Sequence, residues 1–243
     1  MYGSRAKIGF MIPSSCLVFE QEFLKITAGL EGVSGVPARL LITTCDAAGL
    51  VTMNQQIDLA SEQLATCDPD VVLYGCTSGS FMDGNAGEQA IVQRISAIVS
   101  KPVATLSQAV LAAMKRLALK RVVMLTPYDE PLTRLETDWL SGNGIETVDV
   151  HYCDIKENLD RGSQRLADSF ERAMGLNWAE ADGLFLSCGN VPYLQIIERL
   201  ETQTGRPVVT SSTAGTWTAL RLAGVNEPIN GFGRLLATQA NGS

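Results

Sequence analysis

Two short stretches decide how this chain folds: VVLYGCTSG at residues 71–79 and GLFLSCGN at residues 183–190. Each begins with an apolar run of the length of a buried strand and continues into small polar residues around a cysteine. In open α/β sheets, ligands bind at the carboxyl end of a strand, where the next helix begins. The two stretches therefore predict an α/β fold in which Cys76 and Cys188 lie at ligand-binding strand ends.

Further apolar, strand-sized segments alternate along the chain with segments of helical periodicity. This alternation predicts parallel sheets joined by right-handed helical crossovers. The strands are expected at Lys7–Ile12, Arg39–Thr43, Val71–Tyr74, Val103–Leu106, Arg121–Leu125, Thr147–His151, Gly183–Leu186 and Val208–Thr210.

The same order of segments occurs twice. KIGFMIP at residues 7–13 matches RVVMLTP at 121–127, and KPVATLS at 101–107 matches RPVVTSS at 206–212. Any two α/β segments share some likeness, but the two cysteine stretches fall between these pairs in the same order. We therefore predict two pseudo-symmetric lobes, each a roughly four-stranded parallel sheet flanked by helices, with the active site in the cleft between them. The lobes would span residues 1–115 and 116–243, and the C-terminal helix would be free to pack back on the first lobe.

The composition excludes several classes of protein. The 243 residues are 46% hydrophobic and 19% charged, which supplies a core and argues against disorder. The net charge is −7, and lysine and arginine are scattered singly, so no nucleic-acid partner is expected. No apolar run approaches the ~18 residues of a membrane span, and the N-terminus does not resemble a signal peptide. We therefore expect a cytoplasmic protein without membrane association.

The chain has one histidine, His151, and six cysteines. A single histidine excludes metal sites that need two, and no Cys-x-x-Cys motif is present, so we expect no metal site. In a cytoplasmic protein the cysteines are expected to be reduced thiols rather than a disulfide framework.

Cys76 and Cys188 occupy equivalent positions of the repeat. Helix N-termini beside them would attract a carboxylate and lower the pKa of a nearby thiol. If the lobes are related by a pseudo-twofold axis, the two thiols flank one small ligand. This arrangement suits removal of a proton from one face of a carbon and delivery to the other. The alternative is that both are ordinary buried cysteines at strand ends.

At this point the sequence resembles the aspartate/glutamate racemase superfamily, and most closely its branch of arylmalonate decarboxylase and maleate cis-trans isomerase. The resemblance spans nearly the whole chain. It is carried by CTSGSF at residues 76–81, TPY at 126–128, SCGN at 187–190, GRPVVTSSTAGTW at 205–217 and GFGRL at 231–235.

The resemblance implies cofactor-free chemistry on a carboxylated carbon through an enediolate-like intermediate. Members that racemise or isomerise use a cysteine on each side of the substrate, whereas the decarboxylase keeps only the second. Cys76 stands at the first position here, which favours two-thiol chemistry. Maleate isomerase-like members carry an asparagine after Pro-Ser-Ser, and this sequence has Cys16 there, which is a departure from their pattern.

An enediolate needs hydrogen-bond donors at its carboxylate oxygens. The candidates for substrate binding supply hydroxyl or backbone N–H groups beside the two cysteines or at the ends of neighbouring strands: Ser14, Thr77, Ser78, Tyr128, Gly189 and Asn190. For Thr77, Ser78 and Tyr128 the expectation also rests on the resemblance. Helix capping is the alternative for the small residues, and a half-buried rim position is the alternative for Tyr128.

Ser15 and Cys16 are candidate contact residues. Ser15 either donates to the carboxylate or caps a helix. Cys16 is a third active-site thiol, a substrate contact in place of an amide, or an inert neighbour. The remaining cysteines, Cys45, Cys67 and Cys153, are expected to be structural, and His151 is expected at the surface or in a structural role.

The sequence thus predicts a cofactor-independent racemase or isomerase of a small carboxylate, with Cys76 and Cys188 as the acid/base pair. An arylmalonate-type decarboxylase and a non-catalytic carboxylate-binding protein are the alternatives. No basic residue stands out at a strand end, which disfavours a dicarboxylate clamped by arginine. The resemblance also implies a homo-oligomer.

Overall fold

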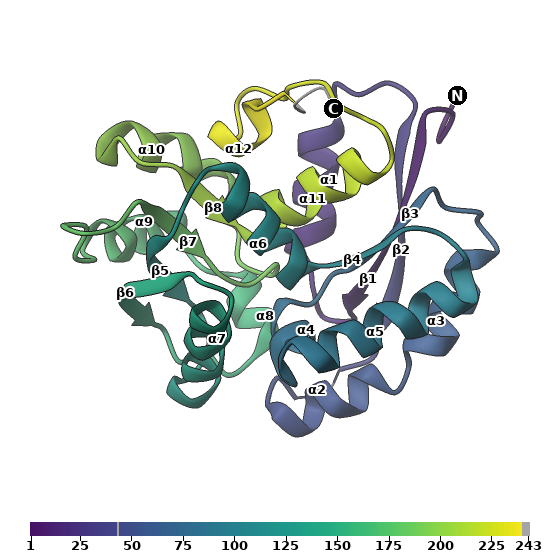
Figure 1. Ribbon diagram of the computed structural model, residues 1–243, viewed down its shortest axis with the longest axis horizontal. Helices are drawn as coiled ribbons and strands as arrows, with labels where there is room; N and C mark the ends of the chain where they lie inside the picture. The colour runs from purple at the N-terminus through teal and green to yellow at the C-terminus, as the bar shows by residue number, and fades with distance from the viewer. Residues whose placement is uncertain (43, 240–243) are drawn as a thin grey trace.

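The computed structural model describes residues 1–42 and 44–239, and it contains two parallel four-stranded sheets, as predicted (Figure 1). The first sheet has the order β2-β1-β3-β4 and the second has the order β6-β5-β7-β8, so the two repeat the same topology. The strands are β1 (Ala6–Pro13), β2 (Val33–Leu40), β3 (Val71–Tyr74), β4 (Val103–Thr105), β5 (Arg121–Thr126), β6 (Glu146–Tyr152), β7 (Gly183–Leu186) and β8 (Val208–Thr210).

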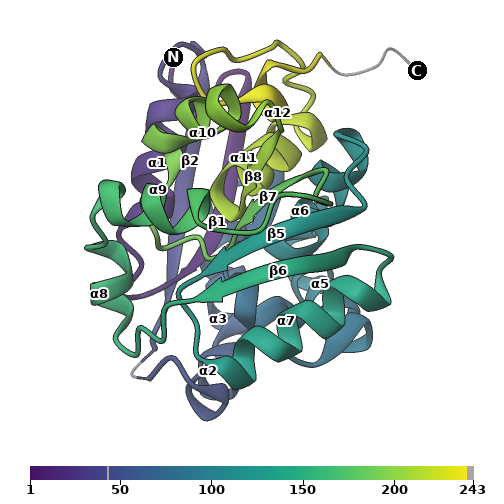
Figure 2. The same ribbon diagram turned by 90° about the vertical axis from the view of Figure 1, so that its left-hand side faces the viewer.

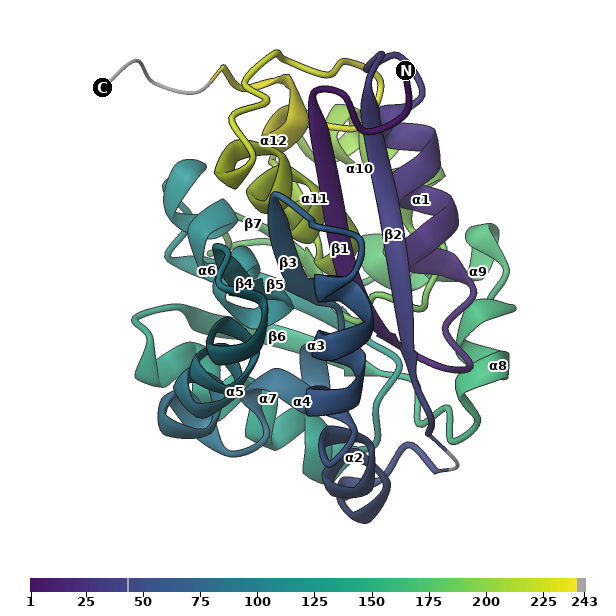
Figure 3. The same ribbon diagram turned by 90° about the vertical axis from the view of Figure 1, so that its right-hand side faces the viewer.

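Helices flank both sheets, as the turned views show (Figures 2 and 3). The helices between β1 and β5 are α1 (Val18–Thr27), α2 (Ala47–Asn54), α3 (Ile57–Ala65), α4 (Thr77–Phe81), α5 (Gly84–Val99) and α6 (Leu106–Arg116). Those after β5 are α7 (Glu130–Gly142), α8 (Asn158–Gly162), α9 (Leu166–Met174), the 3-10 helix η1 (Leu194–Ile196), α10 (Ile197–Thr204), α11 (Ser211–Leu222) and α12 (Arg234–Ala237). No helix in the described ranges combines the length and the apolar character that a bilayer crossing requires.

The strand prediction was wrong at β2. The expected segment Arg39–Thr43 overlaps the observed strand, Val33–Leu40, only at its end, and Thr43 lies outside the described residues. Gly35 and Pro37 made the true segment resemble a loop. However, β2 is an edge strand paired only with β1, and an edge strand tolerates a proline because one side of it needs no hydrogen-bond donors.

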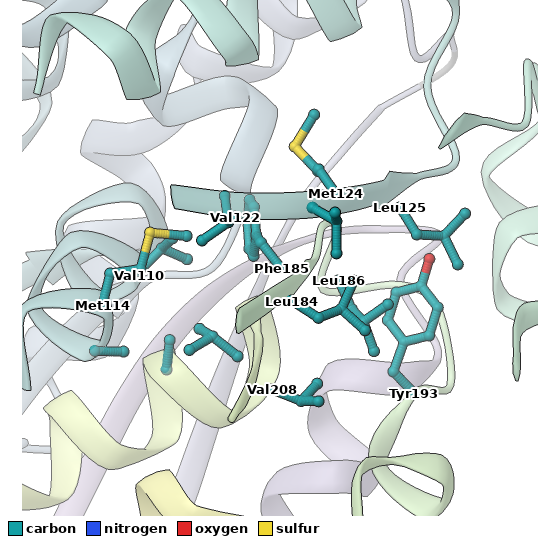
Figure 4. Close-up of a cluster of buried hydrophobic side chains, with 14 of the residues drawn as sticks. Val110, Met114, Val122, Met124, Leu125, Leu184, Phe185, Leu186, Tyr193 and Val208 are labelled. Atoms are coloured by element: carbon teal, nitrogen blue, oxygen red, sulfur yellow. The ribbon is translucent and has the colours of Figure 1, made fainter. Parts of the chain in front are cut away.

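The central strands carry the buried core. All four residues of β3 and all four of β7 are buried. In the second lobe, side chains from β5, β7, β8 and α6 pack together, and Figure 4 shows Val110 and Met114 of α6 beside this sheet's residues. Helix α6, which follows the last strand of the first sheet, therefore contributes to the core of the second lobe.

Helix α11 makes the reciprocal exchange. It follows the second sheet, yet Ala219 and Leu220 belong to the apolar cluster of the first lobe, and α11 packs against α1 and α6. A Cβ added at Gly215 of α11 would lie only 2.4 Å from a methyl carbon of Leu106, so glycine permits the close approach of the two helices. This reciprocal packing fixes the two lobes against each other and thereby places the carboxyl ends of β3 and β7.

Candidate active site

The carboxyl ends of β3 and β7 bring Cys76 and Cys188 to one small cavity. Both cysteines are 7% exposed, and the cavity between the lobes measures about 30 Å³. Its lining comprises Pro13, Cys16, Ile42, Cys45, Leu50, Gly75, Cys76, Thr77, Ser78, Tyr128, Asn158, Arg161, Cys188, Gly189 and Asn190. Ile42, Cys45, Asn158 and Arg161 also line a wider vestibule of about 340 Å³. The two thiols thus line one chamber, and the shared residues lie where this chamber meets the vestibule.

Cys76 is the N-cap of the short helix α4. The backbone N–H of Gly79 donates to its Sγ at 3.4 Å, and the hydroxyl of Ser78 lies 3.8 Å from the same sulfur. A Cβ at position 79 would lie 3.1 Å from Sγ and 2.5 Å from the Tyr74 hydroxyl, so only glycine leaves the approach open. The CTSG sequence therefore supplies the sulfur and its hydrogen-bond donor from one helical turn.

Cys188 has a strained backbone, with φ +83°. A residue that has a β-carbon rarely adopts this left-handed region, and such backbone strain is frequent at functional sites. Its N–H donates to the Ser211 hydroxyl at 3.1 Å, and the Asn190 N–H donates to its Sγ at 3.4 Å. One hydrogen bond to α11 and one within the turn thus hold the Cys188 backbone and sulfur at the cavity.

The sequence predicted lowered thiol pKa values, and burial has the opposite effect. Desolvation raises the pKa of Cys76 to about 12 and also raises the pKa of Cys188. The Gly79 N–H and Ser78 hydroxyl oppose the rise at Cys76. At Cys188 the nearby charge of Arg161 opposes it most, followed by the Asn190 N–H and the Tyr128 hydroxyl. Both residues are therefore thiols in the folded protein, and these donors stabilise a thiolate when one forms.

Thr77 and Tyr128 offer hydrogen-bond donors to a ligand. Thr77 is 2% exposed, and its hydroxyl has no partner among the described residues. Burial raises the pKa of Tyr128 well above its usual value near 10, so its hydroxyl is a neutral donor. Gly189 completes the lining beside Cys188. Neutral donors from both lobes therefore line the cavity that holds both sulfur atoms.

Three of the predicted binding residues have hydrogen-bond partners within the protein. The Ser14 hydroxyl accepts from the Ile42 N–H at 3.1 Å, and Ser14 does not line the cavity. The Ser15 hydroxyl accepts from the Asn158 amide at 2.8 Å and faces the vestibule. The Asn190 side chain accepts from the N–H groups of Leu17 and Val18 at 2.9 and 3.2 Å, so it ties the two lobes together.

Cys16 lies in the cavity lining and is 1% exposed. Its Sγ lies 3.8 Å from the carbonyl oxygen of Gly189, and burial raises its pKa to about 12. The side chain therefore stands beside the Cys188 turn as a neutral thiol that also joins the lobes.

Sequence reasoning missed the residues that follow β2 and β6. Cys45 was expected to be structural, yet it lines both chambers, as do Asn158 and Arg161. The symmetry of the repeat carried the missing signal, because β2 and β6 are equivalent strands whose carboxyl ends face the same cleft. The misplaced β2 boundary concealed it. Cys67 is exposed and Cys153 is half-buried, and neither lines the cavity.

No cluster of three or more histidine, cysteine, aspartate or glutamate side chains suited to a metal ion occurs in residues 1–42 and 44–239.

Comparisons with known proteins agree with this geometry. Residues 32–236 match the family model described as arylmalonate decarboxylase. The chain is 28% identical to a maleate isomerase from Nocardia farcinica over 95% of both chains, and 32% identical to the arylmalonate decarboxylase of Bordetella bronchiseptica over 65% of this chain and 68% of that protein. A solved structure of the N. farcinica maleate cis-trans isomerase superposes with a TM-score of 0.93 and 25% identity, covering 97% of this chain and 99% of that chain. That structure is a cysteine-to-serine variant with a covalently bound succinylcysteine intermediate.

Proposed function

Because the chain belongs to the arylmalonate decarboxylase family, we propose that it is a cofactor-independent isomerase of a small carboxylate that works through Cys76 and Cys188. The observation that carries the proposal is the pair of thiols at equivalent strand ends, facing one cavity lined by neutral donors. Maleate isomerases are similar over nearly the whole chain, which favours cis-trans isomerisation over racemisation of an amino acid.

The thiols would act in sequence on an unsaturated dicarboxylate. The Cys76 thiol first gives its proton to solvent water and recovers one at the end of the cycle. The resulting thiolate adds to one alkene carbon, and the π electrons move to the adjacent carbon and its carboxylate as an enediolate. The Cys188 thiol then protonates that carbon. The former double bond is now a carbon–carbon single bond, and rotation about it brings the two carboxylates into the trans arrangement. Return of the added proton to Cys188 and expulsion of the Cys76 thiolate then give the trans isomer. Electrons and protons balance without a cofactor.

We assign the addition to Cys76, whose sulfur accepts from the Gly79 N–H and lies 3.8 Å from the Ser78 hydroxyl, and the proton transfer to Cys188. Thr77 and Tyr128 are the proposed donors to the developing enediolate, together with the backbone at Gly189. Donors that are positioned before the charge develops typically supply the largest part of catalysis in such reactions.

Decarboxylation of a malonate is the second candidate, since a decarboxylase is among the similar proteins. The presence of Cys76 favours isomerisation, because the sequence pattern of the decarboxylase keeps only the second cysteine. The two reactions differ in their products, since only decarboxylation releases carbon dioxide.

The test is a proton NMR assay in D₂O with a panel of maleate, the enantiomers of aspartate and glutamate, and an arylmalonate. We expect maleate-type isomerisation in the wild type and a loss of roughly 10²–10⁴-fold in Cys76→Ala and in Cys188→Ala, because each variant lacks one positioned proton or thiolate. Cys67→Ala is the matched control, because that thiol is exposed and does not line the cavity. Full activity of either cavity variant would refute the two-thiol mechanism, and carbon dioxide release with loss only in Cys188→Ala would establish the decarboxylase.

We further propose a homo-oligomer, which the resemblance to the superfamily implies, and a location in the cytoplasm, which the sequence analysis predicted from the cysteine usage. Sedimentation velocity of the purified chain tests the first part and a tagged chain in fractionated cells tests the second.

A further inference from the structure

Arg161 is the one charged residue that lines the inner cavity within the described part of the chain. It belongs to the short helix α8, which Figures 2 and 3 place near the carboxyl end of β2. The residue is only 5% exposed, and it lines both the inner cavity and the vestibule. Its guanidinium therefore stands where the two chambers meet.

The charge of Arg161 lacks an acidic partner. Its Nε donates to the carbonyl oxygen of Ile155 at 2.9 Å, and its guanidinium carbon lies 5.2 Å from the centre of the Tyr128 ring. Across residues 1–42 and 44–239 no carboxylate oxygen lies within 4.0 Å of its nitrogens, whereas its neighbours Lys156 and Arg165 each have such a partner. A buried charge without a counter-ion is costly, so a protein that keeps one there usually pairs it with a ligand.

The neutral donors line the inner cavity alone, whereas Arg161 also lines the vestibule. Thr77, Ser78 and Tyr128 surround the sulfur atoms, and they suit one carboxylate without contributing a positive charge. A guanidinium presents a planar fork that matches a carboxylate with two parallel hydrogen bonds. A substrate held between the sulfurs by its inner carboxylate would therefore direct its other end toward Arg161.

We propose that Arg161 is a specificity-determining residue that selects substrates with a second carboxylate at the end nearest the vestibule. This inference rests on the proposed function, because it takes the space between Cys76 and Cys188 as the reacting site. It also reverses the expectation from the sequence that no arginine clamps a dicarboxylate. Monocarboxylates and half-esters leave the Arg161 charge unpaired and should be poor substrates.

The decisive variants are Arg161→Met, which keeps the length and apolar bulk of the side chain, and Arg161→Lys, which keeps the charge without the fork. Arg165→Met is the matched control, because that arginine has a side chain 79% exposed and faces neither chamber. Maleate and its monomethyl ester are the two substrates. We expect Arg161→Met to lose about 10- to 100-fold in kcat/KM for maleate, the usual strength of a hydrogen bond to a charged group, with the half-ester changed less than about threefold. Arg161→Lys should lie between the wild type and Arg161→Met.

A second readout works without turnover. Succinate, which has no double bond, should protect Cys188 of the wild type from iodoacetamide, butyrate should protect it far less, and Arg161→Met should abolish the difference. Equal losses for both substrates in Arg161→Met, or unchanged discrimination between succinate and butyrate, would overturn the inference. One outcome separates the two proposals. The wild type shows no isomerisation of any substrate, and succinate protects Cys188 only when Arg161 is present. In that case the proposed function fails, and the assignment of Arg161 as the anion-binding residue stands.

Discussion

Replacing Glu136 by glutamine is expected to flatten the pH dependence of the protein's stability. Glu136 lies on α7 and is fully buried behind the active-site strands. Its Oε1 accepts a hydrogen bond of 2.5 Å from the hydroxyl of Ser187, the residue before Cys188, and its Oε2 has no partner among the described residues. Glu136 therefore holds the residue that directly follows β7 by a buried hydrogen bond.

Burial raises the pKa of Glu136 to about 8 from its usual 4.5, while the hydrogen bond from Ser187 and the nearby hydroxyl of Thr126 oppose the rise. Since the folded pKa lies above the unfolded value, the folded protein binds more protons than the unfolded chain between about pH 4.5 and pH 8. The free energy of unfolding must therefore fall as the pH rises through this window. At about 1.4 kcal/mol per pH unit, the upper limit of the loss is about 5 kcal/mol.

Urea unfolding at pH 5, 6.5 and 8 measures this effect. Glu136→Gln keeps the acceptor for Ser187 and cannot ionise, so it should lose much less stability than the wild type between pH 5 and pH 8. The amide nitrogen would have no partner, but that penalty does not depend on pH, so the slope is the test. Glu62→Gln, on an exposed face of α3, should keep the wild-type slope. An unchanged slope in Glu136→Gln would refute the assignment of an ionisable, buried Glu136.

Three further substitutions separate binding, catalysis and packing. Thr77→Val removes a buried hydroxyl that has no partner among the described residues. The thermal unfolding temperature should change little, while kcat/KM falls about 10-fold in the NMR assay. A large loss of stability would show that the hydroxyl serves the fold. Tyr128→Phe should lower kcat by about 10²–10³-fold in steady-state kinetics, since it removes a donor to the enediolate, and an unchanged kcat would exclude that role. Gly215→Ala should lower the free energy of unfolding in urea by about 1–3 kcal/mol, because the added Cβ lies 2.4 Å from Leu106. Gly142→Ala, which has open space around it, should leave that free energy unchanged or raise it. Equal effects of the two substitutions would contradict the tight α6–α11 contact.

Local signals were sufficient for three fully buried strands. The segments Val71–Tyr74, Gly183–Leu186 and Val208–Thr210 have the same bounds in the sequence prediction and in the structure. These strands are buried on both faces, so apolar runs mark them clearly. The edge strand β2 contains Gly35 and Pro37, and its pairing with β1 overrides the local preference of those residues.

The candidate site divides in the same way. Cys76 and Cys188 follow the best-predicted strands, and a repeated motif marks them. Arg161 follows the edge strand β6 and carries no motif, and its importance comes from burial and from the lack of a partner, which only the tertiary structure shows. The same is true of Asn190, whose side chain bonds residues distant in sequence across the two lobes.

The central claim is that Cys76 and Cys188 act on opposite sides of one substrate, with Cys76 forming the covalent bond. The most direct measurement is peptide mapping by mass spectrometry of Cys188→Ser after incubation with maleate. The two-thiol mechanism predicts that one substrate molecule is attached through a saturated carbon to Cys76. An unmodified Cys76, or an adduct at Cys16 or Cys45 instead, in a protein whose wild type isomerises maleate, would contradict it.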